Sequence, residues 1–237
     1  GFPQLAVPGS LDGVQPAVQF PEKRSRLVPF LRGGKVKVDT YTQPVLGNPD
    51  ARYVFVKLFD YTCRQCKIIH GYLESVNRRY PNQIAVVVLP CPLSTQCNAY
   101  VSKTGKHHVN ACQLARLAMV VWRTKPESFA EFHHWMLAYE DDTPRDIPET
   151  LDKVEKLLGR NPSKILASNS GLAPRIDKMI SQYTKLYNLC GKGAIPKLIY
   201  EDKIIQGKNP SLDSFVELLV IRLGMELTSS PQPIDGI

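Results

Sequence analysis

The stretch that decides the fold is residues 53–67, which read YVFVKLFDYTCRQCK. Its first half, 53–59, is an apolar run typical of a buried strand. Cys63 and Cys66 follow at C-x-x-C spacing. Beyond them come apolar side chains at helical spacing: Ile68, Ile69, Tyr72, Leu73 and Val76. The sequence therefore predicts a strand, a turn and a helix, with Cys63 at the helix N-terminus.

The predicted position of Cys63 favours a reactive thiol, because the N–H groups and the dipole at a helix N-terminus stabilise a thiolate. Arg64 and Lys67 add positive charge that should lower the thiol pKa further. Cys66 lies three residues on, on the same helical face, close enough to close a disulfide. Arg64 and Gln65 are expected to tune the stability of the reduced form. We therefore expect Cys63 to be the nucleophile of thiol–disulfide exchange and Cys66 the resolving thiol.

The composition indicates a globular protein and argues against nucleic-acid binding and a membrane-spanning segment. The chain has 237 residues, of which 43% are hydrophobic and 22% charged, so it can bury a core. The net charge is +8, but no block of Lys and Arg is interleaved with aromatic residues, so nucleic acid is not an expected partner. No apolar run approaches the roughly 18 residues that cross a membrane.

The cysteines indicate the compartment. Six cysteines are an even number and more than one redox pair needs, which favours an oxidising, periplasmic or otherwise extracytoplasmic location. The chain begins with Gly1 rather than Met. This start suggests a mature or truncated chain, so one interpretation is that a leader or membrane tether was lost from the N-terminus.

The pattern along the chain predicts four parts. Residues 1–34, rich in Pro and Gly, read as an extended arm or linker, and 228–237 as a flexible tail. Residues 35–90 and 190–227 read as one α/β domain, interrupted by a helical insertion over 91–189. Expected strands cover 35–40, 53–59, 84–89, 197–200 and 203–205. Expected helices run to about 80 and over 111–122, 127–139, 148–158, 174–189 and 211–227.

The elements follow the order β-α-β, a helical insertion, then β-β-α. In this order the chain resembles a known family. It is similar to the thioredoxin superfamily, specifically the DsbA-like thiol:disulfide oxidoreductases, over roughly residues 40–226. The stretches that carry the resemblance are VLGNPDA (45–51), FDYTC (59–63), FAEFHHWML (129–137) and GAIP (193–196). It implies an α/β thioredoxin fold with a DsbA-like all-helical insertion, and activity as a thiol:disulfide oxidoreductase.

The resemblance also implies roles for Ile195 and Pro196. In thioredoxin-like proteins the proline at this position is cis and lies against the active-site disulfide, and the residue before it pairs with a bound peptide as a strand would. Ile195 stands where Thr or Val is more usual, so it offers no side-chain hydrogen bond. The expected partners are cysteine-containing protein substrates and a redox partner that resets the Cys63–Cys66 pair. No organic cofactor is implied. The oxidase direction is favoured, since no dimerisation arm of an isomerase is evident.

Four further cysteines allow three full pairings. Cys97 and Cys112 flank a polar loop before the helical insertion, and a bridge there would pin this loop, so this pair is the structural disulfide we favour. The state of Cys91 and Cys190 is left open. They could be two buried free thiols or a second disulfide, or Cys190 could take part in a redox relay.

Two other classes of function remain open. A soft-metal chaperone would bind Cu(I) through Cys63 and Cys66, assisted by a histidine or Cys91. A non-catalytic interaction domain would keep the disulfide only for structure. No metal site is assigned, because a zinc site usually needs two C-x-x-C pairs or a matching histidine pair. Roles for Asp60, His70 and the pair His133–His134 near the thiols are likewise left open.

Overall fold

The computed structural model describes residues 24–168, 171–206 and 211–228. Its centre is a five-stranded sheet in the order β3-β5-β4-β6-β7. The strands are β3 (Val45–Gly47), β4 (Tyr53–Phe59), β5 (Ile84–Pro90), β6 (Lys197–Tyr200) and β7 (Lys203–Ile205). β4 and β5 are parallel, while the other neighbours are antiparallel. The predicted β-α-β unit and the closing hairpin are therefore confirmed.

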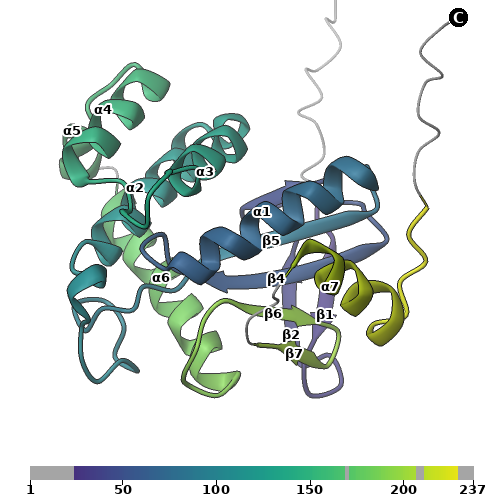
Figure 1. Ribbon diagram of the computed structural model, residues 1–237. Helices are drawn as coiled ribbons and strands as arrows, with labels where there is room; N and C mark the ends of the chain where they lie inside the picture. The colour runs from purple at the N-terminus through teal and green to yellow at the C-terminus, as the bar shows by residue number, and fades with distance from the viewer. Residues whose placement is uncertain (1–23, 169–170, 207–210, 229–237) are drawn as a thin grey trace, which may run out of the picture.

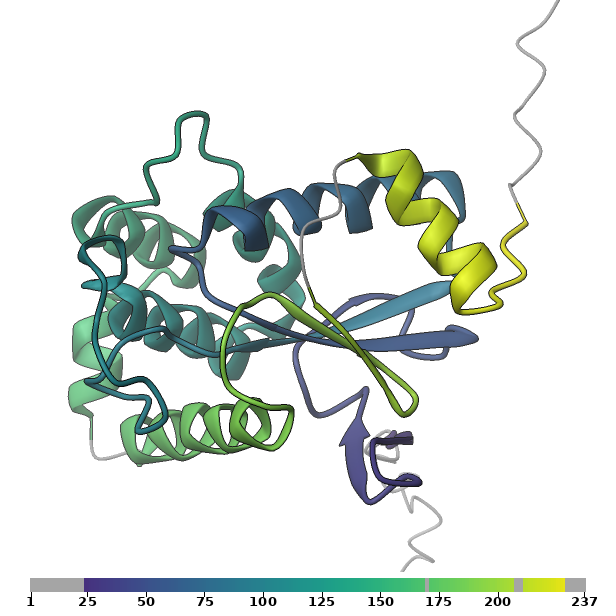
Figure 2. The same ribbon diagram turned by 60° about the horizontal axis from the view of Figure 1, so that its bottom comes forward.

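Helices cover both faces of this sheet, which explains why β4 and β5 are continuous apolar runs rather than alternating ones. Every residue of β4 and β5 is buried. Helices α1 (Arg64–Arg79) and α7 (Leu212–Glu217) lie on one face, and α6 (Leu172–Leu189) lies on the other (Figures 1 and 2). A π-helical turn, η3 (Leu218–Arg222), continues α7.

The segment between β5 and β6 is helical, as expected. It contains α2 (Ala111–Thr124), α3 (Phe129–Leu137), α4 (Ile147–Leu158), α5 (Pro162–Ala167) and α6, with short 3₁₀ turns η1 (Lys106–His108) and η2 (Pro126–Ser128). These helices gather beside the end of the sheet from which α1 begins (Figure 1). The sequence pattern missed α5, since six residues are too few to show a helical period. Its N-cap is Asn161, whose side chain accepts from two backbone N–H groups.

The chain ends differ from the sequence prediction. Within the predicted arm, Leu27–Phe30 forms β1, which pairs with β2 (Val36–Asp39) in a separate two-stranded sheet. The buried Phe30 side chain anchors this hairpin to the core. Residues 1–23 of the predicted arm and 229–237 of the predicted tail lie outside the described residues.

The closing helix is shorter than expected. It begins after Ser211, whose hydroxyl accepts from the backbone N–H of Ser214, so the predicted cap is confirmed. It ends at Arg222 rather than near Leu227. The reason is Gly224, which takes the positive φ (69°) typical of a helix C-terminus.

The cysteines outside the C-x-x-C pair follow the favoured pairing. Cys97 and Cys112 form a disulfide across 15 residues, which ties the polar loop to the start of α2. Cys91 and Cys190 are both free and buried. Within the described part of the chain, no helix has the length and apolar character to cross a membrane.

Removing the Cys97–Cys112 bridge should destabilise the fold without touching the sheet. The double variant Cys97→Ser/Cys112→Ser should lose about 3 kcal/mol of unfolding free energy, because a loop of about 15 residues is no longer closed in the unfolded chain. Urea denaturation measures the change, with Cys190→Ser as the control for loss of a cysteine. A difference between the two below about 1 kcal/mol would contradict this role.

Candidate active site

The end of β4 and the start of α1 place Cys63. After β4 ends at Phe59, the Cys63 N–H donates to the Asp60 carbonyl at 3.1 Å, which closes a tight turn. Cys63 is the N-cap of α1, with extended backbone angles (φ −94°, ψ 112°). Its carbonyl accepts from the N–H of Cys66 at 3.0 Å, so the two thiols share the first turn of α1.

A cleft of about 540 Å³ opens over Cys63. Its lining comes from the C-x-x-C turn, the loop after β5, η1, the loop after α3 and the segment before β6: Thr62, Cys63, Arg64, Gln65, Leu93, His107, His108, Asp142, Ala194 and Ile195. Cys63 is half-buried here, whereas Cys66 lies wholly beneath the surface. The exposure of the two thiols therefore matches the predicted roles of attacking and resolving cysteine.

The two thiols have opposite pKa shifts. A hydrogen bond from the Cys66 thiol is the main reason that the pKa of Cys63 is lowered, with backbone N–H groups of Gln65 and Cys66 adding to it. Burial raises the pKa of Cys66 well above its ordinary value, and its interaction with Cys63 raises it further. Of the two thiols in the reduced pair, Cys63 is therefore the one that ionises first, while Cys66 keeps its proton.

The peptide bond between Ile195 and Pro196 is cis, as the resemblance implied. Ile195 lies beside the nucleophile, since its carbonyl oxygen is 3.8 Å from Cys63 Sγ. The approach to this bond is held by Tyr187, whose hydroxyl donates to the Gly193 carbonyl at 2.9 Å and accepts from its N–H at 2.8 Å. The backbone before β6 is thus fixed against the cysteine pair.

The cations predicted to tune the thiol have other partners. Arg64 forms an exposed ion pair with Asp142 at 2.8 Å, and Lys67 donates to the carbonyl oxygens of Tyr139 and Glu140. Neither is among the main causes of the Cys63 pKa shift. Both instead connect the start of α1 to the loop after α3. Gln65 is half-buried and lines the cleft.

The sequence prediction missed Lys57, which lies in the middle of β4 and is fully buried. Its Nζ donates to the Cys66 carbonyl at 3.3 Å. Burial lowers the pKa of Lys57 to about 8, against the opposing influence of the two thiols. In return, its charge lowers the pKa of Cys66 and so partly offsets burial. The signal was present in the sequence, as one lysine inside an otherwise apolar strand.

Asp60, left open by the sequence, is a buried acid under the cleft. Its side chain accepts from the N–H and hydroxyl of Thr62 and from the N–H of Leu93, at 2.7–2.8 Å. His108 Nδ1 is 2.7 Å from the Thr62 hydroxyl and 3.6 Å from Asp60 Oδ2. Burial raises the pKa of Asp60, and its charge opposes ionisation of Cys63.

Neither His133 nor His134 lines the cleft; His107 and His108 do. His133 is buried behind the site, with Nδ1 2.8 Å from the Tyr61 hydroxyl, and burial holds the pKa of His133 well below its ordinary range. His70 is also buried, with a pKa lowered by the same cause.

Comparison with known proteins supports the fold. No protein-family model matches the chain, and no curated protein does. Among solved structures, ScsC of Proteus mirabilis in a transitional conformation is 22% identical (TM-score 0.59), covering 77% of this chain and 72% of that one. A periplasmic thioredoxin-like protein of Salmonella enterica serovar Typhimurium is 21% identical (TM-score 0.59), covering 78% of this chain and 91% of that one. Oxidised BdbD of Bacillus subtilis is 23% identical (TM-score 0.56), covering 78% of this chain and 94% of that one. The chain thus has the DsbA-like thioredoxin fold that its sequence predicted.

Alkylation across pH tests the lowered pKa of Cys63. Because the thiolate persists to lower pH, the midpoint of the iodoacetamide rate at Cys63 should lie below that of free cysteine, about 8.5. Cys66→Ala removes the donor to Cys63 and should move the midpoint upward, while Cys190→Ala should leave it in place. Peptide mass analysis assigns the label. A wild-type midpoint at or above the free-cysteine value would contradict the lowered pKa of Cys63.

Proposed function

We propose that this chain is a thiol:disulfide oxidoreductase that exchanges disulfides with protein substrates through Cys63 and Cys66. The observation that carries the proposal is the pairing of a half-exposed thiol of lowered pKa with a fully buried thiol of raised pKa, on one helical turn. The cis peptide bond at Pro196 beside this pair supports it. The reaction needs no organic cofactor, because the two sulfur atoms carry both electrons.

In the oxidase direction, a substrate thiolate attacks Cys63 of the oxidised pair. The Cys63–Cys66 bond breaks, a mixed disulfide forms on Cys63, and Cys66 leaves with the electron pair and takes up a proton. A second substrate thiolate then attacks the substrate sulfur of the mixed disulfide. Cys63 leaves as a thiolate, and a low leaving-group pKa speeds this step. The substrate gains a disulfide, and the chain is left reduced.

The surroundings of the pair suggest how a substrate is held. The backbone at Ile195 is fixed beside Cys63, and a peptide lying along it would be bound by main-chain hydrogen bonds. Such bonds carry little sequence specificity, which suits substrates that share only a cysteine. The aliphatic Ile195 side chain adds no hydrogen bond, so recognition rests on the backbone.

We favour the oxidase direction, because a stabilised Cys63 thiolate makes the reduced form the more stable one and the disulfide a strong oxidant. Turnover then requires a redox partner that removes two electrons from the reduced pair. We place the protein outside the cytoplasm, in the periplasm or an equivalent compartment, where the Cys97–Cys112 disulfide would also persist.

A trapping experiment tests the reaction class. Oxidised wild-type protein should convert a reduced two-cysteine peptide to its disulfide. Cys66→Ser is instead given a disulfide-linked peptide dimer: its Cys63 thiolate should attack that disulfide, release one peptide as a thiol and accumulate a mixed disulfide with the other, visible by mass. Cys63→Ser should do neither, and Cys190→Ser should behave as wild type. No turnover, together with binding of one Cu(I) by reduced Cys63 and Cys66, would replace the proposal with a metal chaperone.

Lys57→Met tests the buried lysine. Resolution of a Cys63–glutathione mixed disulfide should slow by about threefold for each unit by which the Cys66 pKa rises, because the thiolate fraction falls tenfold while the nucleophilicity of the remaining thiolate rises about threefold. The unfolding free energy should stay equal or rise, because a buried cation is replaced by an apolar side chain. Quenched-flow kinetics and urea denaturation measure the two effects.

Lys67→Met is the matched control, because it removes a cation that binds the carbonyl oxygens of Tyr139 and Glu140. It should leave the resolution rate close to wild type. Equal slowing in the two variants would show that Lys57 has no special influence on Cys66.

A further inference from the structure

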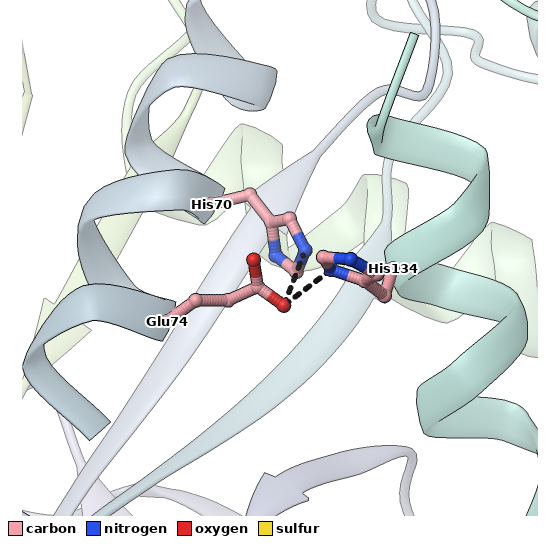
Figure 3. A group of neighbouring side chains, drawn as sticks. All are labelled: His70, Glu74 and His134. Carbon is pink, nitrogen blue, oxygen red and sulfur yellow. Dashed lines mark ion pairs between the residues drawn. The ribbon is translucent and has the colours of Figure 1, made fainter. Parts of the chain in front are cut away.

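Three potential metal ligands meet where α1 faces α3, beyond the first turn of α1 that carries the cysteine pair. His70 and Glu74 lie one turn apart on α1, and His134 comes from the facing helix α3 (Figure 3). Glu74 Oε1 is 2.5 Å from His134 Nδ1 and 3.4 Å from His70 Nε2. One ligand atom from each residue lies within 4.8 Å of the other two.

His70 is the unusual member of this cluster. Its residue is only 4% exposed, yet Nδ1 has no hydrogen-bond partner among the described residues, and Nε2 has only the 3.4 Å contact with the Glu74 carboxylate. Buried polar atoms normally have well-formed hydrogen bonds, so a buried imidazole with one long contact and one unpartnered nitrogen needs an explanation. Figure 3 shows the ring directed at the Glu74 carboxylate and the His134 ring. A cation between the three side chains would accept the electron pair of Nε2, the nitrogen that faces Glu74.

The spacing suits a tetrahedral cation. Ligands at 2.0–2.1 Å from zinc lie about 3.3 Å apart, close to the 3.4 Å between His70 and Glu74. His134 would have to withdraw from Glu74 by less than about 1 Å. Its side chain is 55% exposed, so it has room to do so.

We propose that His70, Glu74 and His134 bind one divalent cation of the zinc class, with a water molecule as the fourth ligand. Two imidazoles and one carboxylate are a ligand set that zinc uses with one open position. Calcium and magnesium prefer oxygen ligands alone, and Cu(I) prefers thiolates. This site replaces our expectation from the sequence that the chain holds no metal.

The surroundings allow the cation to enter. A cavity of about 440 Å³ reaches the cluster from solvent and is lined by His70, Glu74, Asn77 and Ala130, among others. No described residue offers His70 Nδ1 the acceptor that usually orients a metal-bound imidazole, so the affinity should be lower than at sites with that support. Bound metal would tie α1, which carries the cysteine pair, to α3.

Zinc titration of the full chain tests the proposal. The protein is first oxidised so that Cys63 and Cys66 cannot bind the metal, and calorimetry then measures binding. We expect one Zn²⁺ per chain. Loss of a partner that only orients a ligand costs about 10- to 100-fold in affinity. His134→Ala and Glu74→Gln, which remove direct ligands, should each weaken binding by at least about a hundredfold.

Two matched variants control for charge and surface changes. His107→Ala removes an exposed histidine elsewhere, and Glu131→Gln removes a carboxylate of α3 that pairs with Lys153 at 2.8 Å. Both should bind zinc as wild type does. His134 is largely exposed, so its truncation leaves no buried cavity and folding is preserved. Zinc should raise the melting temperature of wild type but not that of His134→Ala.

Cobalt distinguishes this site from thiolate binding. Co²⁺ at the cluster should give visible d–d absorption without the near-ultraviolet sulfur-to-cobalt charge-transfer bands. In His134→Ala the d–d absorption should be lost as well, because the cobalt site is gone. Absence of binding, equal affinity in His134→Ala and His107→Ala, or spectra dominated by sulfur bands would each overturn the proposal.

Discussion

The structure depends on the burial of β4, all seven residues of which are excluded from solvent. A strand covered on both faces and paired on both edges cannot shift its register, because a shift by one residue would exchange its two sets of side chains. Its end therefore fixes where α1 begins. Cys63 is placed at the helix N-terminus and Cys66 beneath it, so exposure and burial of the two sulfur atoms follow from the packing of one strand.

The same burial explains the electrostatics of the pair. Cys66 cannot ionise easily without solvent, so it serves as a hydrogen-bond donor to Cys63. Lys57 and Asp60, both buried within a few residues, influence the thiols in opposite directions. Lys57 favours ionisation of Cys66, whereas Asp60 opposes ionisation of Cys63. Water would screen such charges, but in the protein interior they stay effective.

The sequence predicted what short-range patterns control. The apolar run of β4, the helical spacing after Cys66 and the two strands 197–200 and 203–205 each appear where expected. It missed features that depend on tertiary contacts: β1 is held by pairing with β2, and β3 by antiparallel pairing with β5. Arg64 and Lys67 were expected to act on the thiol, but contacts with the distant loop after α3 engage them. No local pattern brings His134 to His70.

The reduction potential of the Cys63–Cys66 pair, measured by equilibration in glutathione buffers and resolved by alkylation mass shift, tests the account most directly. Stabilisation of the Cys63 thiolate predicts a potential clearly more oxidising than the value of about −270 mV for thioredoxin, displaced toward the value of about −120 mV for DsbA. A potential at or below that of thioredoxin would contradict the account. The lowered pKa of Cys63 would then not favour the reduced form, and the oxidase direction would be wrong.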